Sequence, residues 1–82
     1  MNWAEREQAI SDTRREFVAR SSIRMMQCTT KVLGGYKIQA LGWLGRLETL
    51  SEGANATALS DILALQRQIT RQIAEIDRLS VQ

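Results

Sequence analysis

The sequence predicts an all-α fold, a helical hairpin with one long and one shorter helix. Its 82 residues include no proline and few aromatic side chains. A β-rich domain of this length would show more β-branched residues and regularly spaced turn residues. Apolar residues instead recur at steps of three, four and seven on both sides of one polar segment. We expect a single domain, 1–82, and, because so small a core is marginal, a homo-oligomeric bundle or coiled coil.

The first helix is expected over about residues 3–51. Asn2 can accept a hydrogen bond from a free backbone amide as an N-cap, and Glu5 can reach back to it, which predicts a start near Trp3. The apolar spacing then continues from Ile10 through Phe17 and onward along one stripe.

Gly34-Gly35 leaves two forms of this helix open. The helix can run through the glycines with a bend, or it can break there into two helices. We favour the continuous form, because no Pro, Asp, Asn or Ser flanks the pair to build a turn. The second helix would cover only half of a continuous first helix of about 70 Å. The N-terminal half of that helix would then need another chain or surface. A break would let three helices close as a monomer.

A turn is expected over about residues 52–57, followed by a second helix over about 58–80. Gly53 can adopt the left-handed conformation that ends a helix, and Asn55 or Thr57 can cap the next one. In that second helix Ile62, Ile69 and Ile76 follow each other at heptad steps. This spacing is typical of a coiled-coil seam.

The residue types present argue against catalysis. The chain has no histidine and one cysteine, Cys28, which excludes the usual zinc sites and the nucleophile–histidine arrangements. Gly34-Gly35 with Lys37 lacks the spacing of a phosphate-binding loop. We therefore expect no enzyme, no catalytic residue, no metal and no cofactor.

The central part of the chain combines apolar bulk with charge of one sign. No acidic residue lies between Glu16 and Glu48, whereas five basic residues do. Such a segment suits a partner protein, an anionic lipid layer or a hydrophobic particle. Nucleic acid is not favoured, because few aromatics lie near these charges and no nucleic-acid motif is present. The predicted contact stripe consists of Phe17, Met25, Val32, Tyr36, Trp43 and Leu47, with Arg20, Arg24, Lys31 and Lys37 as flanking charge.

The expected location is the cytoplasm. The single cysteine permits no disulfide within the chain, which fits a reducing compartment. The first residues do not show a basic region followed by an apolar run, so no signal peptide is expected. The most apolar stretch, 32–47, is too short and too charged for a membrane span.

The junction from Trp43 to Gln68 resembles the phasin family. Its carrying feature is Asp61-Ile62-Leu63-Ala64-Leu65-Gln66, which is similar to the pattern that opens the second helix in many phasins. Phasins are helical proteins associated with polyhydroxyalkanoate storage granules. The resemblance implies a non-enzymatic coat protein that adsorbs to an apolar polymer through amphipathic helices and assembles as small oligomers. The chain is shorter than most phasins, and its Gly34-Gly35 and the acid-free segment depart from them.

Two functions are therefore expected as alternatives. The first is phasin-like adsorption to polyhydroxyalkanoate granules. The second is a small helical adaptor, chaperone or inhibitor, of a secretion-system or phage type, that binds a partner protein through the basic apolar face. Adsorption through apolar area should survive high salt, whereas nucleic-acid binding should not.

Overall fold

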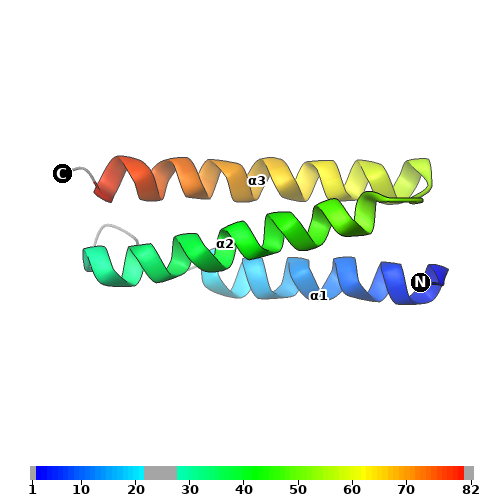
Figure 1. Cartoon of the computed structure of the whole chain (residues 1–82), viewed down its shortest axis with the longest axis horizontal. Helices are drawn as coiled ribbons and strands as arrows, with labels where there is room; N and C mark the ends of the chain where they lie inside the picture. The colour runs from blue at the N-terminus through cyan, green and yellow to red at the C-terminus, as the bar shows by residue number, and fades with distance from the viewer. Residues whose placement is uncertain (1, 22–27, 81–82) are drawn as a thin grey trace.

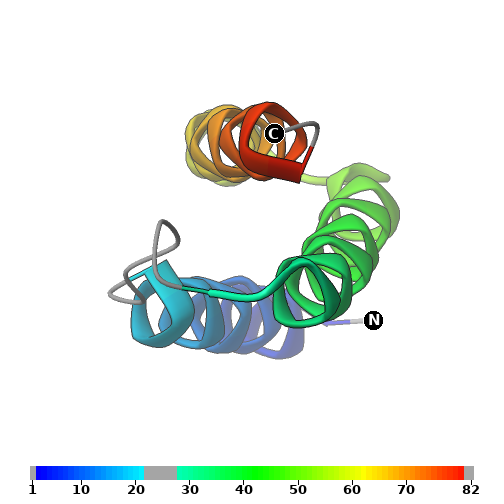
Figure 2. The same ribbon diagram turned by 90° about the vertical axis from the view of Figure 1, so that its left-hand side faces the viewer.

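The structure, a computed structural model, describes residues 2–21 and 28–80 of the chain. It contains three helices, α1 (Trp3–Ser21), α2 (Thr30–Ser51) and α3 (Ala56–Ser80). They lie side by side along the long axis of the molecule and alternate in direction (Figure 1). Viewed from the end, α2 stands between α1 and α3 and packs against both (Figure 2). The all-α prediction is confirmed.

The prediction of one continuous helix over 3–51 is wrong, because α1 ends at Ser21 and α2 begins at Thr30. The break does not fall at Gly34-Gly35 either, since both glycines lie inside α2. α2 begins after Thr29, whose backbone is extended and whose side chain accepts a hydrogen bond from the amide of Val32. Thr29 is thus an N-cap that the apolar periodicity concealed.

The other helix ends follow the sequence closely. At the start of α1, Asn2 accepts from the Glu5 amide at 2.8 Å, and the Glu5 carboxylate reaches back to the Asn2 amide. At the far end of α2, Gly53 has a positive φ of 74°. The Ala58 amide donates to the Asn55 side chain at 2.8 Å, which caps α3. The predicted turn is confirmed, with α3 beginning two residues before the expected position 58.

The core is centred on α2. Each helix contributes apolar residues from one face, but α1 contributes least. From α1 only Ile10, Thr13 and Phe17 are buried, whereas α3 contributes Ile62, Leu65, Ile69 and Ile76. On α2 the buried residues define the inner face: Leu33, Tyr36, Ala40, Trp43, Leu47 and Leu50. The N-terminal apolar stripe therefore finds its partner inside the chain, as α1 folds back on α2.

Candidate binding surfaces

Most of the predicted contact stripe lies inside the closed bundle. Phe17, Tyr36, Trp43 and Leu47 are buried where α1 and α3 cover α2, whereas Val32 is half exposed. Met25 lies outside the described residues. A partner that meets the closed bundle therefore touches Val32 but not the four buried side chains. Their role as contact residues stays a prediction that requires α1 to move.

Three aromatic side chains form the centre of the seam between α1 and α2. Trp43 packs edge-to-face against Phe17, with ring centroids 5.9 Å apart, and against Tyr36, at 6.1 Å. These are favourable geometries for aromatic pairs, because the positive edge of one ring meets the negative face of another. Trp43 is only 2% exposed, so this cluster is shielded from water in the closed bundle.

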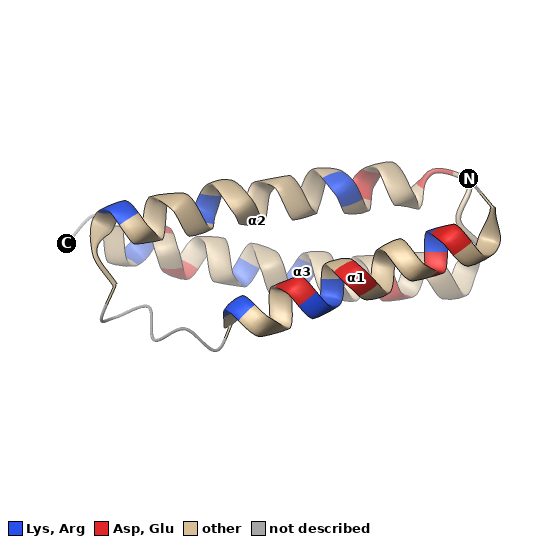
Figure 3. Cartoon of the chain, turned by 90° about the horizontal axis from the view of Figure 1, so that it is seen from below, with Lys and Arg blue, Asp and Glu red and all other residues tan. Residues whose placement is uncertain are grey.

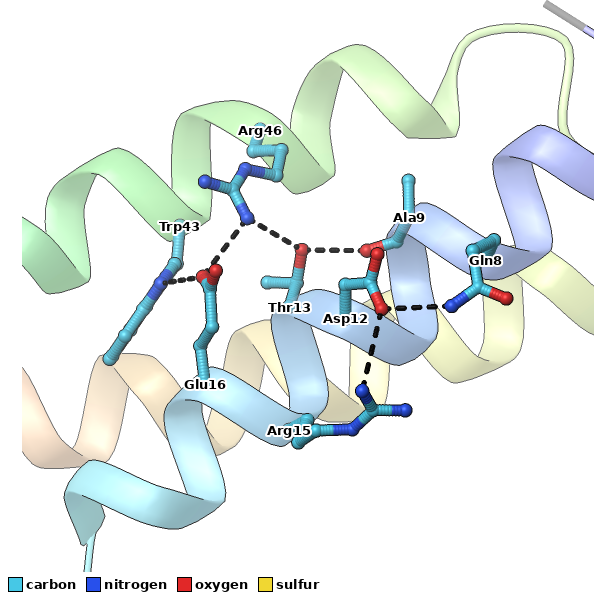
Figure 4. A network of polar contacts seen from close by, with 8 residues as sticks. All are labelled: Gln8, Ala9, Asp12, Thr13, Arg15, Glu16, Trp43 and Arg46. Atoms are coloured by element: carbon cyan, nitrogen blue, oxygen red, sulfur yellow. Dashed lines mark hydrogen bonds and ion pairs between the residues drawn. The ribbon is translucent and has the colours of Figure 1, made fainter.

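A polar network borders the aromatic cluster (Figure 4). The Glu16 carboxylate accepts from the Trp43 indole nitrogen at 2.9 Å and from the Arg46 guanidinium at 3.0 Å. The Arg46 guanidinium also reaches the Thr13 hydroxyl at 3.4 Å, and that hydroxyl donates to the Ala9 carbonyl. The network joins α1 to α2, and Glu16 and Arg46 remain about half exposed.

Two further arginines of α1 hold its ends. The Arg6 guanidinium donates to the carbonyls of Glu52 and Gly53, at 2.8 and 3.2 Å. Near the other end, Arg20 donates to the Gln39 side chain at 2.9 Å. The attachment of α1 thus combines two buried apolar side chains with polar contacts near the surface.

The predicted flanking cations divide into three groups. Arg20 bonds Gln39, and Lys37 pairs with Asp77 of α3 at 2.5 Å, so both act within the bundle. Lys31 is exposed and makes no ion pair with any residue in the described part of the chain. Arg24 lies outside the described residues.

The structure brings together a second surface that the sequence analysis did not single out. The side of α2 that faces away from α1 and α3 is the outer face: Lys31, Gly34, Ile38, Leu41, Gly45 and Glu48. All six are exposed, and the exposed fraction reaches 74% at Ile38 and 50% at Leu41. In Figure 3 α2 is mostly tan, with few charged positions. The signal in the sequence was the spacing 31, 34, 38, 41, 45, 48, a heptad pattern hidden between the more hydrophobic residues.

The environment of Tyr36 is apolar. Desolvation by burial raises the pKa of its hydroxyl, and the nearby Arg20 charge opposes this in part. Within the described residues the hydroxyl finds no hydrogen-bond partner. A phenol buried without a partner costs free energy, so Tyr36 is held by its ring contacts rather than by its hydroxyl.

Neither a search for metal sites and membrane spans nor comparison with known proteins assigns a function to the described residues. Within residues 2–21 and 28–80, no three acidic, cysteine or histidine side chains group as a metal site would require. In the same part of the chain, the search for a helix long and apolar enough to cross a bilayer found none. No family model, curated protein or solved structure matches the sequence or the fold.

Proposed function

We propose that this chain is a non-enzymatic, cytoplasmic binding protein that adsorbs, phasin-like, to the surface of polyhydroxyalkanoate granules. In the proposed mechanism α1 swings away from α2, and the predicted contact stripe meets the polymer. The observation that carries the proposal is that α1 covers an aromatic cluster while burying only two apolar side chains of its own. The acid-free segment between Glu16 and Glu48 and the phasin-like junction support it from the sequence.

The cost of opening comes mainly from apolar side chains on both α1 and α2. Only Ile10 and Phe17 of α1 are buried apolar side chains. Each contributes about 1.5–3 kcal/mol by burial, so exposing the α1 side of the interface costs about 3–6 kcal/mol, and exposing the buried rings of Tyr36 and Trp43 on α2 adds to that cost. The Glu16–Arg46 pair adds little, because both side chains are about half exposed and already screened by water.

The free energy gained on adsorption also comes from covering apolar side chains. Opening uncovers Phe17, Tyr36 and Trp43; in the closed bundle Trp43 packs against each of the other two rings. An aromatic side chain covers about 150–250 Å² of apolar area, and a polymer surface can cover that area again. The α2–α3 contact, which buries four residues of α3, can stay closed meanwhile. The bundle therefore supplies a stripe that is shielded in water and available at an apolar surface.

Cosedimentation with polyhydroxybutyrate particles tests the proposal. The wild-type protein should bind the particles and remain bound at about 0.5 M salt, where the Debye length is only a few Å. Trp43→Ser should weaken binding strongly, because Trp43 is at the centre of the stripe. Trp3→Ser is the matched control, since Trp3 is 62% exposed and lies outside the stripe; its binding should be unchanged.

A distance measurement separates lost binding from lost folding. In a Cys28→Ser background, spin labels at Ser11→Cys on α1 and Ser60→Cys on α3 report on opening, since both positions are exposed. The label distance should increase when particles are added and stay unchanged with empty buffer. Absence of adsorption, or adsorption with no change in distance, contradicts the proposal; the first result favours the partner-protein adaptor instead.

A further inference from the structure

The outer face of α2 carries large apolar side chains that the bundle does not use. Ile38 and Leu41 are 74% and 50% exposed, at the middle of the helix. Gly34 and Gly45 flank them at spacings of four residues, and Lys31 and Glu48 stand three residues farther out. The spacing of three and four residues is that of a helix–helix seam.

The glycines of this face have no explanation inside the chain. A side-chain Cβ placed at Gly34 or Gly45 would meet no atom within 4 Å, and both have ordinary helical backbone. Glycine within a helix lowers stability relative to alanine. A closely approaching second helix would explain glycines here, because it brings the two backbones together where no Cβ intervenes.

The order of residues on the outer face points to the occupant. The six positions are symmetric about a point between Gln39 and Ala40. Reversal of the chain direction exchanges Lys31 with Glu48, Gly34 with Gly45, and Ile38 with Leu41. We propose that a second copy of this chain docks antiparallel on the outer face of α2, which makes a two-fold symmetric dimer.

Charge complementarity favours this arrangement. In the antiparallel dimer Lys31 of each chain faces Glu48 of the other, which gives two ion pairs by symmetry. A parallel pair would place Lys31 beside Lys31 and Glu48 beside Glu48, which is repulsive. Neither side chain is engaged in an ion pair with the described residues of its own chain. Both are therefore available to a partner.

The dimer goes beyond the proposed function and does not depend on it. The inner face, with Trp43 and Leu47, lies on the opposite side of α2 and stays covered by α1 and α3. Adsorption through an opened inner face and pairing through the outer face can therefore occur in one molecule. The two can also fail separately, because the dimer is tested without any polymer.

Mass measurement by multi-angle light scattering, over a dilution series, is the first test. The wild-type protein should have the mass of a dimer that dissociates on dilution. Leu41→Glu should be a monomer at every concentration, because it buries two carboxylates at the centre of the seam. Leu63→Glu is the matched control, since Leu63 on α3 is 53% exposed but lies outside the outer face; it should remain a dimer.

Charge reversal tests the antiparallel direction. Lys31→Glu and Glu48→Lys should each raise the dimer dissociation constant by about tenfold or more, because like charges then meet twice. The double variant Lys31→Glu/Glu48→Lys restores opposite charges and should recover the wild-type constant. Circular dichroism should show the same helix content for all variants, since these residues are exposed.

Three results would overturn the proposal. A wild-type protein that is monomeric throughout the series excludes the dimer. A dimer in Leu41→Glu places the interface elsewhere, and a double charge variant that does not recover rejects the antiparallel pairing. A monomer whose binding to polyhydroxybutyrate particles falls with Leu41→Glu would assign the outer face to the polymer instead.

Discussion

The two faces of α2 have the same spacing and opposite environments. The inner face occupies positions 33, 36, 40, 43, 47 and 50, and the outer face occupies the positions two residues before each of these. The inner face carries Tyr36 and Trp43 and is buried. The outer face has glycine or an aliphatic residue at its four central positions and is exposed. One helix thus carries two seams, of which the folded chain fills one.

Neighbouring α3 behaves differently. Its buried residues lie on one face, and the remainder of the helix carries six charged residues beside the exposed Leu59 and Leu63. This is the ordinary pattern of a surface helix, whose second face meets water. The outer face of α2 differs in that its four central positions, Gly34, Ile38, Leu41 and Gly45, carry no charge.

The largest difference between the faces should appear on truncation of a leucine. Leu47→Ala removes a fully buried side chain from the inner face and should lower the free energy of unfolding by about 2–5 kcal/mol. Leu41→Ala on the outer face should change monomer stability by less than about 0.5 kcal/mol. Denaturant unfolding at high dilution measures both, and equal losses would remove the distinction between the faces.

Glycine-to-alanine substitutions at Gly53 and Gly45 should change monomer stability in opposite directions. Gly53 has a φ of 74°, so Gly53→Ala should destabilise the chain by about 1 kcal/mol or more. Gly45→Ala should stabilise the monomer by about 0.5–1 kcal/mol, because the helix gains propensity and the new Cβ meets nothing. The same Gly45→Ala change should weaken the dimer. Thermal unfolding at two protein concentrations separates the effects; destabilisation of the dilute monomer by Gly45→Ala would contradict the account.

The sequence predicted the first helix start and the turn before α3 better than it predicted the break between α1 and α2. The caps at Asn2 and Asn55 and the turn at Gly53 depend on local chemistry and were confirmed. The break before Thr30 was missed, because a threonine cap competes weakly with a long apolar pattern that continues across it. Trp43 was predicted as a contact residue, but it is buried in the bundle. Its burial depends on α1 folding back on α2, which the missed break between the two helices permits.

The polar network at the edge of the inner face should contribute less to the free energy of unfolding than the apolar packing of that face. Glu16→Gln keeps the shape of the side chain but removes the charge that Arg46 and the Trp43 indole contact. It should lower stability by about 1 kcal/mol, since these bonds are half exposed to water. Adsorption to particles should become faster, because α1 detaches more readily. Stopped-flow measurement of Trp43 fluorescence in a Trp3→Phe background checks this, with slower adsorption as the contrary result.

The smallest effect on the inner face concerns Tyr36. Tyr36→Phe should raise stability by up to about 1 kcal/mol at neutral pH, because it removes a buried hydroxyl without a partner in the described residues. Burial raises the pKa of Tyr36 above its ordinary value of 10.0, so the folded state favours the protonated form. That stabilisation is fully present below about pH 10 and is lost as the pH rises further. Tyr36→Phe should therefore lose less stability at alkaline pH than the wild type.

A nuclear magnetic resonance dilution series tests the two-face account most directly. The amide signals of Gly34 and Gly45 report on the outer face, the indole signal of Trp43 reports on the inner face, and Gly53 serves as the glycine control. The account predicts that Gly34 and Gly45 shift on dilution while Trp43 and Gly53 stay in place. Stationary Gly34 and Gly45 signals, or a shift of the Trp43 indole together with them, would contradict it.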